Sequence, residues 1–428
     1  MAKKKQPLTP EERLAAALVP EEEWPYALPD GWKWVYLNGI IDVSKEKTEE
    51  FPPNTKYVGL ENIEKDTGRI RPVNAEGIRS TKNIFEAGNI LYGKLRPYLN
   101  KHGIAGFDGV CSTDILVFQT APSVNKEILN HYFDLPQFIS FSMSHSKGIN
   151  LPRVSAKEIL TARMPLPPLS EQHRLVARIE SLFAKLDAAR EKVQSVLDSH
   201  ETRKAALLHD AFTGKLTAKW REEQGITFES WHSDTLKNLC EKITDGTHHS
   251  PPNAETGDYM YITAKNIKET GIELDNVTYV TTAVHKEIYS RCDVQKGDVL
   301  YIKDGATTGI ATVNTLDEPF SLLSSVAVLR PHKDLLLSSY LKHLLNSAEQ
   351  RSKMIRNMSG NAITRLTLSK IKATSIKVCS LPEQQEIVRI LDRLLAREQR
   401  ARQAAEETLA AIDRMKQSIL ARAFRGEL

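Results

Sequence analysis

The chain has 428 residues, of which 41% are hydrophobic and 26% are charged, and its formal net charge is +4 at pH 7. This composition is typical of folded globular proteins and excludes an intrinsically disordered chain. The length predicts two to three domains, each able to bury a core. Neither a disulfide framework nor a zinc knuckle is indicated, because no Cys-x-x-Cys pair occurs among Cys111, Cys240, Cys292 and Cys379.

No apolar run approaches the roughly 18 residues that a membrane span requires. The N-terminal Met1-Ala-Lys-Lys-Lys is followed by polar residues rather than by the apolar core of a signal peptide. The scattered cysteines fit a reducing compartment. We therefore expect a soluble protein of the cytoplasm.

Residues 1–25 form an N-terminal extension. Thr9 is followed by Pro10 and two glutamates, which is typical of the start of a helix, and we expect this short helix to end by Pro20. If the two halves described below form a pseudo-symmetric ring, this extension lies beside the C-terminal end of the chain.

Residues 26–168 form the first predicted globular domain. Short β-like runs such as 90–92 and 115–118 are separated by Gly, Asp, Asn and Pro, which indicates a mixed α/β domain. The segment holds 17 basic and 15 acidic residues. Any contact with nucleic acid must therefore be local rather than spread over the domain.

Residues 169–216 predict a long helix. Its apolar residues recur at alternating steps of four and three, which is the seam of a coiled coil. Pro167 and Pro168 mark its start, and Gly214 lies at a helix-stopping position. The predicted seam residues are Leu175, Ile179, Leu182, Leu186 and Val193.

Residues 217–379 predict a second globular domain of the same kind as the first. The stretch from Gly88 to Lys94 is echoed from Gly297 to Lys303, and this domain holds 20 basic and 19 acidic residues. Two copies of one fold with diverged loops suit two related ligands of different sequence.

Residues 380–428 repeat the long helix at an offset of 212 residues, so Glu171-Gln172 matches Glu383-Gln384. About 40 residues of helix run roughly 60 Å, too long to be buried in one ordinary domain. We interpret the two helices as spacers or as arms that pair with each other, against the alternative of a generic amphipathic hairpin. Glu398 interrupts the second seam where Leu186 stands in the first. The predicted seam residues here are Ile387, Leu391, Leu394, Ile412 and Ile419.

We find no catalytic constellation. The stretch from Gly88 to Lys94 has P-loop spacing, but Leu95 follows where a Ser or Thr must reach magnesium. No Gly-x-Gly-x-x-Gly fingerprint occurs, and His248-His249 lacks the neighbouring ligands of a metal site. We predict no catalytic residue and no metal site.

The remaining candidate residues are ones that could contact nucleic acid. The run from Lys94 to His102 lacks an acidic residue, so its cations could neutralise phosphates, Arg96 could bind a guanine edge and Asn100 could read adenine. The alternative for each residue is a solvated loop. The candidate DNA-binding residues are Lys94, Arg96, Tyr98, Asn100, Lys101, Arg153, His248, Lys303, Thr307, Thr308, Arg356 and Arg365.

These motifs, in their order and repeated once, resemble the DNA-specificity subunit of type I restriction-modification systems. The resemblance rests on the two helix starts, on residues 90–101 (ILYGKLRPYLNK), 245–252 (DGTHHSPP) and 300–309 (LYIKDGATTG), and on the Phe-x-Gly-x-Leu helix ends. It covers nearly the whole chain.

The resemblance implies an α+β fold: two homologous target-recognition domains separated by two long helices in an antiparallel coiled coil, with pseudo-two-fold symmetry. It implies a non-catalytic subunit that binds double-stranded DNA, each domain reading one half of a split site. It further implies two methyltransferase and two restriction-translocase subunits as partners, on which S-adenosylmethionine, ATP and magnesium would bind. We expect outward helix residues such as Arg178 and Arg190 to face these partners.

Two other functions stay open at this point. The near-neutral domains are compatible with a coiled-coil scaffold that does not read DNA. A self-sufficient enzyme would need catalytic residues that the sequence does not reveal.

Overall fold

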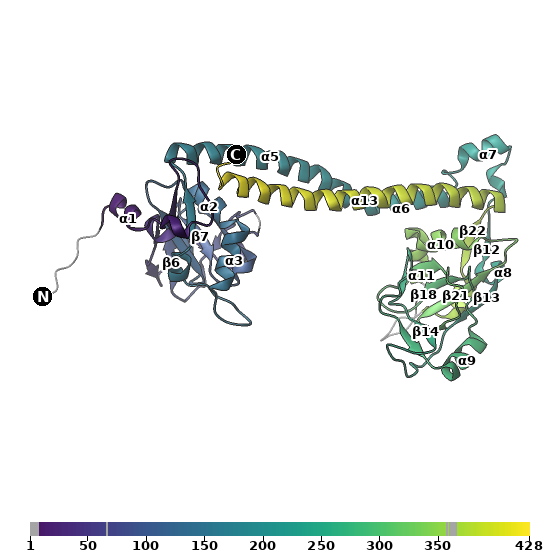
Figure 1. The fold of residues 1–428 in the computed structure, drawn as a ribbon. Coiled ribbons are helices and arrows are strands. Elements are labelled where there is room, and N and C mark those ends of the chain that lie inside the picture. Colours follow the sequence, from purple (N-terminus) through teal and green to yellow (C-terminus); the bar gives the residue numbers. More distant parts are fainter. Residues whose placement is uncertain (1–7, 66, 357, 359–365) are drawn as a thin grey trace. The chain divides into compact units, whose positions relative to one another are not determined.

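The computed structural model describes residues 8–65, 67–356, 358 and 366–428. The chain forms two compact units (Figure 1). Unit 1 comprises Met1–Gln194 and Glu407–Leu428, and unit 2 comprises Ser195–Glu406. Within the described ranges no helix is both long and apolar enough to cross a membrane.

Unit 1 is a mixed α+β unit with three sheets. The central sheet has the strand order β2-β10-β7-β8, a second has the order β3-β6-β9-β4-β5, and β1 pairs with β11. All neighbours are antiparallel except β4 and β9. Its strands are β1 (Lys33–Tyr36), β2 (Ile41–Val43), β3 (Lys47–Thr48), β4 (Lys56–Val58), β5 (Val73–Asn74), β6 (Lys82–Phe85), β7 (Ile90–Gly93), β8 (His102–Ile104), β9 (Gly109–Cys111), β10 (Ile115–Thr120) and β11 (Arg163–Leu166).

Apart from α5 and the C-terminal part of α13 (Leu381–Ala423), the helices that the structure describes in unit 1 are short. Thr9 caps α1 with a reciprocal capping box to Glu12, as the sequence predicts. The α-helices are α1 (Pro10–Ala16), α2 (Lys126–Phe133), α3 (Pro136–Ser144), α4 (Ala156–Ile159) and α5 (Leu169–Asp198), and the 3-10 turns are η1 (Glu21–Glu23), η2 (Leu37–Gly39), η3 (Leu60–Asn62) and η4 (Pro97–Leu99).

Strand β7 lies between two apolar layers. Side chains alternate across a strand, so Ile90 and Tyr92 pack into one buried cluster while Leu91 packs into the other. The first cluster also receives Leu175 and Ile179 from α5. The central sheet is therefore buried on both faces, and its loops carry the exposed chemistry.

Unit 2 repeats this plan. Its central sheet, β13-β21-β18-β19, has the same order and the same antiparallel pairing as in unit 1, and β14 pairs with β20 in parallel as β4 does with β9. The strands are β12 (His232–Thr235), β13 (Cys240–Asp245), β14 (Tyr259–Ile262), β15 (Ile267–Lys268), β16 (Gly271–Ile272), β17 (Thr278–Val280), β18 (Val299–Ile302), β19 (Ala311–Val313), β20 (Ser321–Leu322), β21 (Val326–Pro331) and β22 (Ser375–Val378).

The central strand β18 of unit 2 is also buried on both faces. Val299 and Tyr301 face one cluster, and Leu300 and Ile302 face the other. The helical elements of unit 2 are α6 (His200–Phe212), α7 (Ala218–Gln224), η5 (Phe228–Ser230), α8 (Leu236–Leu239), α9 (Thr282–Arg291), α10 (Ser338–Asn346), α11 (Ala348–Arg356) and α12 (Leu368–Ala373).

The two predicted long helices differ in continuity. The second is one helix, α13 (Leu381–Ala423), whereas the first is divided into α5 and α6 at Ser199. The Ser199 hydroxyl donates to the Ser195 carbonyl at 2.6 Å and also accepts from Arg203. The backbone bond from Ser199 N to the Ser195 carbonyl is retained at 3.2 Å. A hydroxyl that bonds back to the preceding turn favours a local bend in a helix, which is consistent with the division at this residue.

Helix α5 runs antiparallel to the C-terminal part of α13 within unit 1. Asp187 accepts from Lys416 at 2.6 Å, and three residues further along α5, Arg190 pairs with Asp413, three residues earlier along α13. Arg190 therefore faces the neighbouring helix, and our expectation that it faces outward is wrong.

Glu398, which interrupts the predicted seam, has a charged partner on the facing helix. Within unit 2 its carboxylate accepts from Arg203 Nε of α6 at 2.7 Å, and Arg203 also donates to the Val196 carbonyl at 3.1 Å. An arginine on the facing helix thus replaces the apolar contact with a hydrogen-bonded ion pair.

The predicted seam residues fall into two groups. Leu175, Ile179, Ile387 and Leu391 are fully buried and belong to the cores of their units, because the first turns of each helix pack on a globular domain. Ile412 is also buried. The half-buried remainder is Leu182, Leu186, Val193, Leu394 and Ile419.

A buried glutamine fixes the start of α5. Gln172 is 1% exposed; its Oε1 accepts from the Asn125 amide at 2.8 Å, and its Nε2 donates to the carbonyls of Ser123 (3.1 Å) and Pro167 (2.8 Å). This side chain satisfies backbone groups that helix and loop leave unpaired.

Gln384 forms the equivalent hydrogen bonds at the start of α13. It is fully buried, accepts from the Leu337 amide, and donates to the carbonyls of Leu335 and Cys379, each at 2.9 Å. The Glu-Gln pair of the repeat therefore has a physical basis: its glutamine ties each long helix to a globular domain.

Candidate nucleic-acid interface

The candidate loop of unit 1 follows β7 and is held by two other segments. Lys94 N donates to the Asp114 carbonyl at 2.9 Å, and the Lys94 carbonyl accepts from Val154 N at 3.0 Å. Arg96 N donates to the Pro152 carbonyl at 2.7 Å. These bonds place Lys94, Arg96 and the loop before Val154 on one rigid base.

Two residues of this loop adopt the left-handed backbone conformation. Arg96 has φ +52° and Asn100 has φ +43°, one on each side of η4. Non-glycine residues hold such a conformation at a cost of roughly 1–3 kcal/mol, and such residues cluster at functional sites. The turn presents Arg96 and Tyr98 to solvent, and Tyr98 is 50% exposed.

One carboxylate lies among the cations of this loop. Asp114 Oδ1 is 3.8 Å from Lys94 Nζ and 3.4 Å from Arg153 Nε. Among the residues that the structure describes, no side chain forms a hydrogen bond or ion pair with Arg96. Lys94, Arg96 and Arg153 therefore make a locally positive surface, although the domain as a whole is near neutral.

Asn100 and Lys101 are turned toward the protein. Asn100 Nδ2 donates to Asp134 Oδ1 at 3.2 Å, and Lys101 Nζ donates to the Leu60 carbonyl at 2.7 Å. Next to them His102 is buried, 3.0 Å from the same carboxylate. Burial opposes the charged form of His102, but Asp134 and Asn130 together raise its pKa above the ordinary value. These side chains brace the loop in this structure, and direct DNA contact by Asn100 and Lys101 stays a prediction.

A neighbouring loop, residues 147–153, was not singled out in the sequence apart from Arg153. Lys147 and Arg153 exchange backbone hydrogen bonds of 2.8 and 2.9 Å, which close it. At its tip Ile149 is 99% exposed and Leu151 is 42% exposed. The sequence signals here are the branched apolar Ile149 between Gly148 and a proline, and the match of Gly148-x4-Arg153 with Gly360-x4-Arg365.

In unit 2 the candidate loop follows β18 and has the same backbone connections. Lys303 N donates to the Ser325 carbonyl, and the Lys303 carbonyl accepts from Leu366 N, so Lys303 is the counterpart of Lys94. Its side chain differs: it is 7% exposed, and its Nζ lies 2.7 Å from Asp304 Oδ2 and 3.6 Å from Asp245 Oδ2. Lys303 orders its own loop here, and its contact with DNA stays a prediction.

Asp245 organises the neighbouring residues. Its Oδ1 lies 3.1 Å from Arg291 Nη2 and 3.4 Å from His248 Nε2. The Asp245 side chain is 4% exposed, whereas the His248 side chain is 62% exposed. The predicted candidate His248 is thus exposed at the surface, and the carboxylate beside it is buried.

The other candidates of unit 2 have different environments. Thr307 is exposed, whereas Thr308 is 6% exposed and donates to the Gly305 carbonyl at 2.6 Å. Arg356 is exposed at the end of α11. Arg365 lies outside the described residues.

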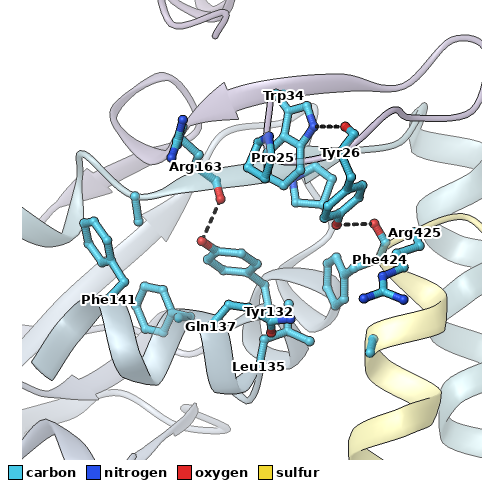
Figure 2. A pocket seen from close by; sticks show the side chains of 14 residues that line it. Pro25, Tyr26, Trp34, Tyr132, Leu135, Gln137, Phe141, Arg163, Phe424 and Arg425 are labelled. Atoms are coloured by element: carbon cyan, nitrogen blue, oxygen red, sulfur yellow. Dashed lines mark hydrogen bonds between the residues drawn. The ribbon is translucent and has the colours of Figure 1, made fainter. Parts of the chain in front are cut away.

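A hollow in unit 1 is lined on one side by Pro25 and Tyr26 and on another by Phe424 and Arg425, at the end of α13 (Figure 2). Tyr26 donates its hydroxyl to the Phe424 carbonyl at 3.0 Å, and Tyr132 donates its own to the Arg163 carbonyl at 2.9 Å. Burial raises the pKa of Tyr26 to about 12.

The family comparison agrees with this duplicated plan. A model described as the type I restriction modification DNA specificity domain matches residues 29–197 and 229–407. The chain belongs to this family. Each matched copy of the specificity domain contains one of the two candidate loops, with Lys94 in the first and Lys303 in the second.

Curated relatives carry the same description. The specificity subunit of the EcoDI type I restriction enzyme from Escherichia coli is 32% identical over 221 residues, which are 51% of this chain and 49% of that protein. The EcoBI specificity subunit from the same species is 24% identical over 431 residues, covering 94% of this chain and 87% of the other. The chain thus matches about half the length of EcoDI and most of EcoBI.

Solved structures of specificity subunits share the fold. The HsdS subunit from Thermoanaerobacter tengcongensis aligns over 95% of this chain and all of its own, with 22% identity and a TM-score of 0.60. A chain from a structure on complex assembly and conformational transition of the type I R-M system covers 94% of this chain and 100% of its own, with 23% identity and a TM-score of 0.77. The predicted α+β fold with two specificity domains and long helices is confirmed.

Proposed function

We propose that this chain is the DNA-recognition subunit of a type I restriction-modification complex, in which each globular unit reads one half of a bipartite duplex site. The observation that carries the proposal is the equivalent placement of Lys94 and Lys303. Two copies of one sheet present a loop at the same strand end, and the two loops differ in charge, exposure and sequence.

The chemistry of the unit 1 loop suits duplex DNA. Lys94 and Arg153 lie beside Asp114 and would contact phosphates, which position the protein without specifying sequence. Arg96 has the guanidinium fork that binds the O6 and N7 acceptors of guanine in the major groove. Its braced backbone limits the entropy lost on binding.

The chemistry of methylation and cleavage would belong to other subunits. In this proposal two methyltransferase subunits supply S-adenosylmethionine, and two restriction-translocase subunits supply ATP and magnesium. The outward faces of the long helices, including Arg178, would serve as their docking surface. The chain itself contributes binding and geometry.

Substitution of Arg96 tests the proposal in the assembled methyltransferase complex. We expect Arg96→Ala to cost about 1–3 kcal/mol and to relax one base position in one half-site, leaving the other half-site unchanged. The readout is methylation of a randomised duplex library followed by sequencing. Arg71→Ala is a matched control, because Arg71 is an exposed arginine of the same unit, 70% exposed and 3.9 Å from Glu64.

A salt titration distinguishes DNA reading from a scaffold role. Binding through phosphates must weaken steeply as salt rises. Binding to duplex DNA without any salt dependence would reject the proposal in favour of a scaffold. In the substitution experiment, an equal loss of affinity of Arg96→Ala for all sequences would make Arg96 a phosphate contact.

A further inference from the structure

The loop that closes between Lys147 and Arg153 ends in a tip, residues 149–151, whose three residues are all exposed. Ile149 is 99% exposed, Leu151 is 42% exposed, and Asn150 between them is exposed. Among the described residues no hydrogen bond to the Asn150 side chain is found. An aliphatic side chain held wholly in water gains nothing for stability, so the tip is better explained by a ligand.

The base of this tip is fixed by backbone hydrogen bonds. Two backbone hydrogen bonds close the loop between Lys147 and Arg153, and the Pro152 carbonyl accepts from Arg96 N at 2.7 Å. Gly148 has φ +100°, and a Cβ there would approach the Leu151 carbonyl oxygen to 3.0 Å. The turn therefore depends on glycine at this position. The tip is joined to the cationic loop of unit 1 and projects beside it.

The charge around the tip selects the partner. Lys147, Arg153 and Arg96 are all exposed nearby, and Asp114 is the carboxylate that faces Arg153. An apolar tip on a loop that carries exposed cations fits a polyanion that also offers apolar groups, and duplex DNA offers these in its major groove.

The residue types identify the base pair. Asparagine binds adenine bidentately at N6 and N7, and aliphatic side chains contact the methyl group of thymine, both in the major groove. An asparagine flanked by two aliphatic residues is complementary to an adenine–thymine pair and its neighbour. We propose that Asn150, with Ile149 and Leu151, reads an A·T pair in the half-site of unit 1. The inference rests on the proposed function and names further specificity-determining residues for it.

The second repeat carries a different sequence at this place. Gly360 aligns with Gly148, and the three residues after it are Asn, Ala and Ile instead of Ile, Asn and Leu. The structure does not describe residues 359–365, so only the sequence is compared. The difference provides a natural replacement: a triple variant, Ile149→Asn, Asn150→Ala and Leu151→Ile, gives unit 1 the residues of the other repeat.

The experiment uses the full chain in complex with its methyltransferase subunits and a randomised duplex library. We expect wild-type complex to methylate a bipartite motif, and Asn150→Ala and the triple variant to lose about tenfold preference at one A·T position of one half-site. Val73→Ala, at an apolar residue of the same unit that is 50% exposed, should change nothing. Unchanged thermal unfolding of each variant excludes misfolding.

The outcomes separate the two proposals. If wild type yields no bipartite motif, the proposed function fails. If the motif appears but the tip variants keep every base preference, or weaken all sequences equally, the proposed function stands and the A·T assignment is overturned.

A second measurement tests the aliphatic contact directly. Replacing the thymine at the affected position by deoxyuridine removes only the methyl group. We expect this to weaken wild-type binding about fourfold and to have no effect on the Ile149→Ala, Leu151→Ala double variant. An equal loss for both proteins would overturn the methyl contact. Increased fluorescence of 2-aminopurine at the neighbouring step would do so as well, because it would indicate a wedge that unstacks bases.

Discussion

Glu171 and Glu383 occupy equivalent positions at the starts of α5 and α13, yet their surroundings differ. Glu171 is paired with Arg174 of its own helix at 2.7 Å, and Arg174 is 52% exposed. Glu383 is fully buried and accepts from Arg221 at 2.5 Å, from Thr217 at 2.7 Å and from Trp231 at 3.1 Å.

The adjacent glutamines differ hardly at all. Gln172 and Gln384 each accept one backbone hydrogen bond and donate two. A buried backbone group without a partner is costly, so the repeat retains the side chain that satisfies these groups. An exposed carboxylate such as that of Glu171 is solvated by water and is under no such constraint. In unit 2 the segment from Thr217 to Trp231 encloses the carboxylate of Glu383.

The largest expected effect concerns this enclosed carboxylate. Glu383→Ala leaves the Arg221 guanidinium buried without its counter-charge, which should destabilise unit 2 by about 3–5 kcal/mol. Glu171→Ala is the matched control and should cost less than about 1 kcal/mol, because its ion pair is at the surface. Urea unfolding with hydrogen exchange resolved by unit measures both; equal losses would remove the distinction between the two glutamates.

An intermediate effect is expected for the glutamines. Gln172→Leu and Gln384→Leu each strand a buried amide and two carbonyls, and each should cost about 1–3 kcal/mol in its own unit. Similar losses in the same unfolding assay would support a common anchoring role. Gln385→Leu is a control at the start of α13, since Gln385 is exposed; a comparable loss there would assign the effect to helix propensity.

The smallest effect is a pH dependence that both units should share. Burial lowers the pKa of His131 and of His343, although Asp134 and Asp392 oppose this. A depressed histidine pKa favours the folded state above the unfolded value of about 6.5, and this stability is lost as pH falls toward the folded pKa. His102, whose pKa is raised, acts in the opposite sense and contributes below that value.

We therefore expect His131→Leu and His343→Leu to flatten the loss of stability between about pH 7 and pH 5, each by up to ~1 kcal/mol. Unfolding midpoints at several pH values measure this. Exposed His232→Leu serves as the control. If the slope survived in both variants, other groups would be responsible for it.

The sequence predicts the framework of this molecule well because the framework is periodic. The steps of four and three identify α5 and α13, and the 212-residue offset identifies the two domains. The surroundings of a single residue cannot be predicted in this way when they depend on a partner that is distant in the sequence. Glu398 looks like a defect until Arg203 is placed opposite it, and the division of the first long helix at Ser199 has no counterpart in α13.

The candidate interface was predicted less completely. The loop after β7 was identified from its charge, but Lys303 and Lys94 look alike in sequence, while the Lys303 side chain is 7% exposed beside two carboxylates and the Lys94 side chain is 27% exposed. Ile149 was missed because composition alone does not distinguish an apolar residue inside a domain from one held at a loop tip. That difference arises from the hydrogen bonds between loops distant in sequence.

The division of unit 1 into two chain segments has a consequence for biosynthesis. Its core includes Leu420, Ala423 and Phe424, which a ribosome produces only after the whole of unit 2. Unit 2 is continuous from Ser195 to Glu406 and can close as soon as it emerges, whereas unit 1, although begun first, must wait. Nascent unit 1 therefore exposes the apolar surface around Tyr132 for the longest time, and it is the part of this protein for which chaperones have the greatest opportunity.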